Sequence, residues 1–196
     1  MQTHTSRRGF LGGCALIAAG AAAGSIVTGS LRTSRAVGAD QRVGAEARVR
    51  QLKLKLPEIP TPVATYVPAV RVDNLLFVSG TGPRRPDGTF TQGRVGRDFT
   101  LAEGNAAARL VGLNMLATVR GSLGSLDKVV RLVRTLGMVN STPDFMQHPQ
   151  VINGFSDLMV EVFGEKFGKG ARAAVGMGSL PSNIPVEIEA IFQVRD

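Results

Sequence analysis

The chain has no tryptophan, one tyrosine, two histidines and one cysteine among its 196 residues. The cysteine is Cys14, so the chain beyond it has no thiol for a disulfide, a thiolate metal site or a cysteine nucleophile. His148 is the only histidine after His4, and a single histidine cannot form a histidine cluster around a metal. No cofactor-binding motif is present either, and we expect a protein that uses no metal and no organic cofactor.

The formal charge of +8 is unevenly distributed along the chain. No acidic residue precedes Asp40, whereas four arginines do: Arg7, Arg8, Arg32 and Arg35. The rest of the chain has 19 basic and 15 acidic side chains, a net charge of +4. Half of the basic character therefore belongs to the N-terminus, and we expect no nucleic-acid partner from charge alone.

The first 39 residues resemble a twin-arginine export signal. Ser6-Arg7-Arg8-Gly9-Phe10-Leu11 is followed by an apolar run to about residue 27, and Val37-Gly38-Ala39 offers small residues for cleavage. The alternative is a retained transmembrane anchor, for which about 17 weakly apolar residues are short. We favour cleavage, a periplasmic location and no stable membrane anchor in the mature protein.

Composition divides the chain into a signal over residues 1–39, a linker over 40–60 and one globular domain over 61–196. The linker is either a tether or a short helix that packs on the domain. Hydrophobic periodicity predicts a β-β-α-β-α-β-β order, hence an α+β fold with one mixed sheet and both helices on one face. The expected strands are 66–72, 75–80, 127–139 and two within 170–194, and the expected helices are 100–120 and 143–165.

The segment 170–194 carries the most informative pattern. Its first predicted strand has one arginine, Arg172, among small residues; the second alternates, with Glu187 and Glu189 on its polar face. A proline-containing turn over 180–185 joins the two strands. A guanidinium beside a carboxylate on adjoining strands can hold a small acid and position a water, although a solvated face gives the same pattern.

The same segment resembles the RidA/YjgF family, whose members hydrolyse reactive enamines and imines. The resemblance rests on A-R-A-A-V-G-M-G-S-L-P from Ala171 and on V-E-I-E-A from Val186. It extends to Thr65-Tyr66-Val67-Pro68-Ala69, to Leu75–Gly80 and to the segment around Asn153, and covers about residues 61–194. It implies the chorismate-mutase-like fold and a homotrimer whose sheets close into a central barrel, with ligand clefts between subunits.

The resemblance also implies roles for individual residues. Arg172 matches the arginine that grips the substrate carboxylate, and Glu187 matches the glutamate that orients or activates the attacking water. The other residues that match the family's pocket are Tyr66, Ser79, Gly80 and Asn153.

The implied reaction is hydrolytic deamination of 2-imino acids, or their enamine tautomers, to 2-oxo acids and ammonia. Two alternatives remain open. A loop with four arginines suggests endoribonuclease-type RNA cleavage; its arginines are Arg84, Arg85, Arg94 and Arg97. The second alternative is a non-catalytic trimer that binds small acids.

Overall fold

A computed structural model of the chain describes residues 43–59 and 65–196. The predicted export signal, its cleavage site, residues 40–42 and 60 of the predicted linker and residues 61–64 of the predicted domain lie outside the described residues. Within the part of the chain that is described, no helix combines the length and the apolar character needed to cross a bilayer.

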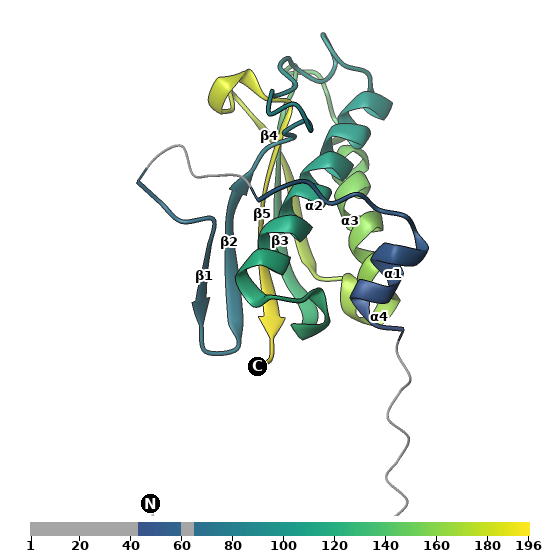
Figure 1. The fold of residues 1–196 in the computed structure, drawn as a ribbon. Helices are drawn as coiled ribbons and strands as arrows, with labels where there is room; N and C mark the ends of the chain where they lie inside the picture. Colours follow the sequence, from purple (N-terminus) through teal and green to yellow (C-terminus); the bar gives the residue numbers. More distant parts are fainter. Residues whose placement is uncertain (1–42, 60–64) are drawn as a thin grey trace, which may run out of the picture. The chain divides into compact units, whose positions relative to one another are not determined.

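The described domain is built on one five-stranded sheet with the order β1-β2-β5-β3-β4 (Figure 1). The β3–β4 pair is parallel and the other neighbours are antiparallel. The predicted α+β class, mixed sheet and order of the main elements are therefore confirmed. The strands are β1 Ala69–Val72, β2 Leu75–Thr81, β3 Val129–Asn140, β4 Ala171–Met177 and β5 Val186–Val194.

The prediction that the last two strands adjoin is wrong, because β3 lies between β4 and β5. The chain leaves β3 through helix α3 (His148–Phe163) and returns as β4, parallel to β3. Parallel neighbours need a crossover of this kind, whereas a tight turn joins antiparallel neighbours. The segment after β4 then carries the chain past β3 to β5, so β4 is an edge strand.

Two long helices cover one face of the sheet. Helix α2 (Leu101–Leu123) begins with a capping box, in which Glu103 N donates to Thr100 Oγ1 at 3.3 Å and Thr100 N donates to Glu103 Oε2 at 2.8 Å. It ends at Gly124, whose φ of 80° is the left-handed geometry that glycine adopts easily. Helix α3 packs beside α2 on the same face (Figure 1).

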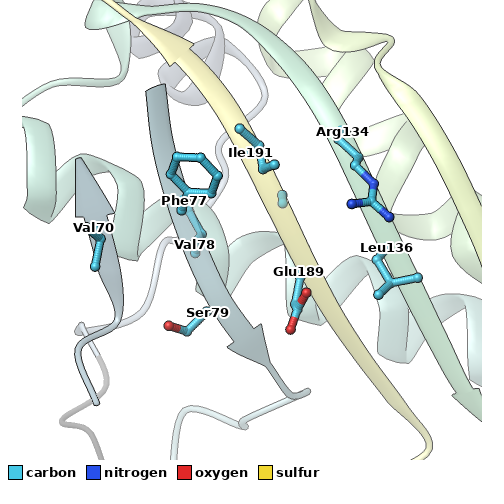
Figure 2. Close-up of a pocket in the computed structure, with 9 residues that line it drawn as sticks. Val70, Phe77, Val78, Ser79, Arg134, Leu136, Glu189 and Ile191 are labelled. Atoms are coloured by element: carbon cyan, nitrogen blue, oxygen red, sulfur yellow. The ribbon is translucent and has the colours of Figure 1, made fainter. Parts of the chain in front are cut away.

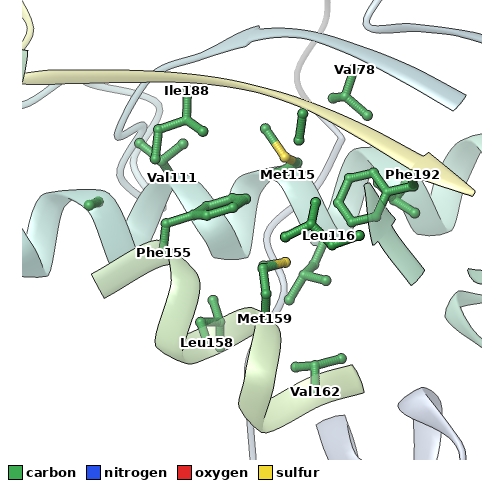
Figure 3. Close-up of a cluster of buried hydrophobic side chains, with 14 of the residues drawn as sticks. Val78, Val111, Met115, Leu116, Phe155, Leu158, Met159, Val162, Ile188 and Phe192 are labelled. Carbon is green, nitrogen blue, oxygen red and sulfur yellow. The ribbon is translucent and has the colours of Figure 1, made fainter. Parts of the chain in front are cut away.

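The apolar core lies between this sheet face and the two long helices (Figure 3). Ile188 and Phe192 of β5 are fully buried against residues such as Met115 of α2 and Phe155 of α3. Because strand side chains alternate between faces, the neighbours of these β5 residues point to the other side. We call that other side the open face; it carries both charged and apolar side chains.

Part of the predicted linker is a packed helix, α1 (Ala45–Gln51). Ala45 and Val49 are buried in the core, and Glu46 accepts two bonds from Arg120, at 3.0 and 2.7 Å. Glu46 also accepts a bond from the backbone N–H of Leu126 at 3.0 Å. Of the two alternatives for this segment, residues 45–51 form the short helix.

Some element bounds differ from the predicted ones. β3 begins at Val129 because residues 126–128 form a 3₁₀ turn, which Ser125 caps by accepting from Asp127 N at 3.1 Å. Helix α3 begins at His148, with Pro149 in its first turn, rather than at residue 143. Tyr66 precedes β1 instead of lying within it. A four-residue helix, α4 (Glu165–Gly168), follows α3.

Candidate functional site

Arg172 reaches from the edge strand β4 toward helix α3. One terminal nitrogen of its guanidinium, NH1, donates to Asn153 Oδ1 at 2.8 Å and to Ser156 Oγ at 3.0 Å. Asn153 and Ser156 are three residues apart on α3, a spacing that places both on one helix face. Two predicted site residues, Arg172 and Asn153, are thus in contact, and the structure adds Ser156.

The guanidinium of Arg172 has only neutral partners. Among residues 43–59 and 65–196 no carboxylate lies within ion-pair distance of it, whereas Arg109 and Arg120 each bind a glutamate through two bonds. Arg172 borders a hollow of about 290 Å³ between β4 and α3. Its charge is therefore available to an anionic ligand, and a guanidinium matches a carboxylate by two parallel bonds.

Glu187 lies on the open face of β5, close to β2. An ideal Cβ built on Gly80 would be 2.1 Å from Glu187 Oε1, so the carboxylate lies directly over the Gly80 backbone. Burial raises the pKa of Glu187, and the negative charge of Glu189 raises it further. Gly80 thus provides the space that lets this half-buried carboxylate lie against β2.

Within one chain, Arg172 and Glu187 project from opposite faces of the sheet. Arg172 pairs with Thr135 of β3, and Glu187 pairs with Met138 of the same strand. Positions 135 and 138 are an odd number of residues apart, and the register between them is regular, so their side chains point to opposite faces. A single chain therefore presents two separate half-sites, one with Arg172 and one with Glu187.

Ser79 lies on the open face beside the Glu187 half-site. Its hydroxyl donates to Val67 O at 2.7 Å, which ties the chain before β1 to the end of β2. Ser79 borders a hollow of about 380 Å³ whose other walls include Phe77, Arg134 and Glu189 (Figure 2). Tyr66 lies close in sequence to this tie and is 48% exposed. Ser79 and Gly80 thus lie with Glu187, and not with Arg172.

The described residues include no group of three histidine, cysteine, aspartate or glutamate side chains suited to a metal ion. His148 begins α3, and its Nε2 lies 3.1 Å from Ser141 Oγ. Its ring also packs edge-on against Phe145, at 5.4 Å between centroids. These contacts tie His148 to the segment that precedes α3.

Three arginines of the loop after β2 form hydrogen bonds with groups of this chain. Arg97 forms two bonds with Asp98, at 3.0 and 2.8 Å, and Arg94 donates to Gly178 O at 2.9 Å. Arg84 donates to Gly88 O at 3.3 Å. The hydrogen bond from Arg97 is the main reason why the pKa of Asp98 falls to about 2. These contacts order the loop and neutralise part of its charge.

Sequence reasoning missed two features of the site. The first is the contact of Ser156 with Arg172. The sequence does contain a signal for it, because Ser156 lies three residues after Asn153 and thus on the same face of the predicted helix. The separation of Arg172 from Glu187 depends on the position of β3, and the helical segment before β4 was its signal.

Comparison with known proteins agrees with this architecture. The family model described as "YjgF/chorismate_mutase-like, putative endoribonuclease" matches residues 46–187. The crystal structure of the protein Atu1372 with unknown function from Agrobacterium tumefaciens is 43% identical, with a TM-score of 0.70 over 77% of this chain and 94% of that one.

Two sequence relatives extend the comparison. Protein TCP17 from Trypanosoma cruzi is 39% identical over 150 residues, which is 76% of this chain and 94% of that protein. A 2-iminobutanoate/2-iminopropanoate deaminase from Dermatophagoides farinae is 30% identical over 154 residues, which is 72% of this chain and 95% of that protein. The family model covers well over half of the chain, and the fold has the same mixed sheet and helices. The chain therefore belongs to the RidA/YjgF family of chorismate-mutase-like proteins.

Proposed function

We propose that this protein hydrolyses reactive 2-imino acids, and their enamine tautomers, to 2-oxo acids and ammonia at a site formed between two subunits of a homotrimer. The observation that carries the proposal is the guanidinium of Arg172, which is held by two neutral groups beside an open hollow. Such a group is suited to bind the carboxylate that every 2-imino acid carries. The deaminase relative supports the choice of a C=N bond as the reacting group.

The second half of the proposed site comes from another copy of the chain. Arg172 and Glu187 face opposite sides of one sheet, so they can meet only if the Glu187 face of one subunit approaches the β4 edge of the next. The open face has apolar residues that favour such a contact: Val70 is 49% exposed, Phe77 41% and Val175 39%. We therefore assign Glu187 of the partner subunit to the site of each Arg172.

The proposed mechanism needs one water and no cofactor. Arg172 holds the substrate carboxylate, and Glu187 of the partner subunit accepts a proton from the water as its oxygen bonds to the C=N carbon. Glu187 passes this proton to the imine nitrogen, which gives a carbinolamine. Glu187 then takes the hydroxyl proton and delivers it to the amine nitrogen as the C–N bond breaks, the C=O bond forms and ammonia leaves. Since imines hydrolyse readily unaided, positioning the two reactants supplies enough acceleration.

The environment of Glu187 suits this role. A general base works best with a pKa near the operating pH, and both burial and the charge of Glu189 raise the pKa of Glu187 toward that range. Once Glu187 has accepted a proton from the water, it is the acid that can return this proton to nitrogen.

The proposal is tested by generating 2-iminobutanoate with an amino-acid oxidase and following its trapping by semicarbazide. Wild-type protein is expected to lower semicarbazone formation, and Arg172→Ala is expected to lose this effect. Arg97→Ala is the matched control, because Arg97 pairs with Asp98 in the loop and should act like wild type. If wild type lowers trapping no more than Arg172→Ala does, the proposed reaction is wrong.

We also propose that this activity operates in the periplasm, on the basis of the twin-arginine pattern at Arg7-Arg8. Fractionation of cells that express the full chain should place the wild type in the periplasm, and a variant with both arginines changed to lysine in the cytoplasm. Equal cytoplasmic retention of the two proteins would contradict this location.

A further inference from the structure

We infer that Ser156 is a second carboxylate-binding group, whose hydroxyl donates to the acid held by Arg172. The inference rests on the proposed function, since it concerns the same substrate carboxylate. It adds a residue that was not among the predicted site residues and that belongs to the same chain as Arg172.

Both side-chain hydrogen bonds of the Arg172 guanidinium within the described chain start from one terminal nitrogen, which donates to Asn153 Oδ1 and Ser156 Oγ. A terminal guanidinium nitrogen has two hydrogens, so these two bonds use its donor capacity. The other terminal nitrogen and Nε make no hydrogen bond to any residue that the structure describes, and their hydrogens remain for a ligand.

The Ser156 hydroxyl accepts a hydrogen bond from Arg172 and still has its own hydrogen to donate. Serine and threonine inside a helix commonly donate to the carbonyl four residues earlier. On α2, Ser122 donates to Thr118 O at 2.9 Å and Thr118 donates to Asn114 O at 3.3 Å. Ser156 makes no bond of this kind in the described chain, so its hydrogen is available.

The hydroxyl hydrogen of Ser156 can be donated into the hollow that Ser156 shares with Arg172. Ser156 and Arg172 border the same hollow of about 290 Å³, together with the polar residues Asn153 and Thr135 and the charged residues Asp157 and Lys169. The bond from the guanidinium occupies a lone pair of Ser156 Oγ and polarises its O–H, which strengthens donation to an anion. A carboxylate in this hollow thus meets a charged donor and a neutral hydroxyl donor side by side.

Binding of the acid and its turnover depend on residues from different subunits in the proposed site. All residues of this carboxylate receptor come from one subunit, whereas Glu187 comes from another in the proposed site. Loss of Glu187 should therefore abolish hydrolysis and leave binding of the acid nearly unchanged. Loss of Ser156 should weaken binding of the acid and, with it, hydrolysis at low substrate concentration.

The test measures binding of 2-oxobutanoate, the stable product acid, by isothermal titration calorimetry. Ser156→Ala is expected to weaken binding roughly tenfold, the usual effect of removing one hydrogen bond to a charged group. Ser156→Thr keeps a hydroxyl and should recover most of the affinity. Ser122→Ala is the matched control, because its hydroxyl binds a helix carbonyl away from the hollow, and its affinity should equal that of wild type.

A crystal structure with 2-oxobutanoate separates direct contact from an indirect effect through Arg172. The inference requires Ser156 Oγ within about 3.0 Å of a ligand carboxylate oxygen. It is overturned if the acid binds Arg172 with Ser156 out of hydrogen-bond range, or if Ser156→Ala binds like wild type. Acid binding that needs Ser156 in a protein that hydrolyses no imine would instead reject the proposed reaction and keep the receptor.

Discussion

The substitution Gly80→Ala tests how the Glu187 carboxylate is positioned. The Cβ of an alanine at position 80 would lie 2.1 Å from Glu187 Oε1 and 3.1 Å from its Cδ. Non-bonded carbon and oxygen atoms do not approach this closely, so the carboxylate must move by about 1 Å or more. Gly80 is not among the residues with positive φ, so alanine fits its backbone conformation without strain.

The expected result is a loss of activity with little loss of stability. A displacement of about 1 Å in a catalytic group lowers the rate roughly 100-fold. A shifted glutamate rotamer costs only about 1 kcal/mol. The assay is kcat/KM for hydrolysis of 2-iminobutanoate, together with the thermal midpoint of unfolding.

Gly178→Ala is the control for this substitution, since its Cβ would meet no atom within 4 Å and its φ is not positive. It should retain the activity of wild type. Wild-type activity in Gly80→Ala would refute the assignment of Glu187 to the reaction, and so would an equal loss of activity in both variants.

Four further predictions concern charge. Burial raises the folded-state pKa of Glu187, so the stability that the protonated side chain contributes is lost as pH rises through that pKa. Glu187→Gln, which cannot ionise, should therefore raise Tm at pH 7 while hydrolysis is lost. Glu189→Gln removes a like charge beside Glu187 and should shift the acidic limb of the kcat/KM profile to lower pH. Arg172→Lys should lose at least about tenfold in kcat/KM, because an ammonium cannot make the paired bonds to a carboxylate. A kcat/KM equal to that of wild type in this variant would contradict a bidentate contact. Glu46→Ala should lower the free energy of unfolding by about 1–2 kcal/mol through loss of its bonds to Arg120 and Leu126 N. Burial opposes ionisation of Glu46, but these bonds outweigh it and lower its pKa, so urea titrations should show the difference above the unfolded-state pKa and its disappearance as pH falls through the folded-state value.

Local patterns in the sequence predicted much of the fold. The alternation in β5 identified which side of the strand is buried, because a sheet with one covered face needs apolar residues at every second position. The helix expected from residue 100 starts within one residue of the observed start of α2, where Thr100 and Glu103 form a capping box. These signals succeed because the forces that set them act between residues close in sequence.

The geometry of the candidate site could not be predicted in the same way. Whether Arg172 and Glu187 share a face depends on the register of β4 and of β5 against β3, which is set by long-range pairing. The position of Gly80 under Glu187 depends on the irregular register of β2 against β5 between Val78 and Thr81. No local pattern encodes the position of Gly80. For the separation of Arg172 from Glu187, the only signal is the helical crossover before β4, whose length excludes a hairpin between β3 and β4.

The most direct measurement is subunit complementation, because the central claim is that Arg172 and Glu187 act together across a subunit boundary. Arg172→Ala and Glu187→Gln chains with different affinity tags are co-expressed in equal amounts, and imine hydrolysis is compared with each parent. In the proposed homotrimer, each mixed assembly has one site with both groups intact, so random assembly should restore about a quarter of the wild-type activity. Activity no greater than that of the two parents, in trimers shown to contain both chains, would contradict the account.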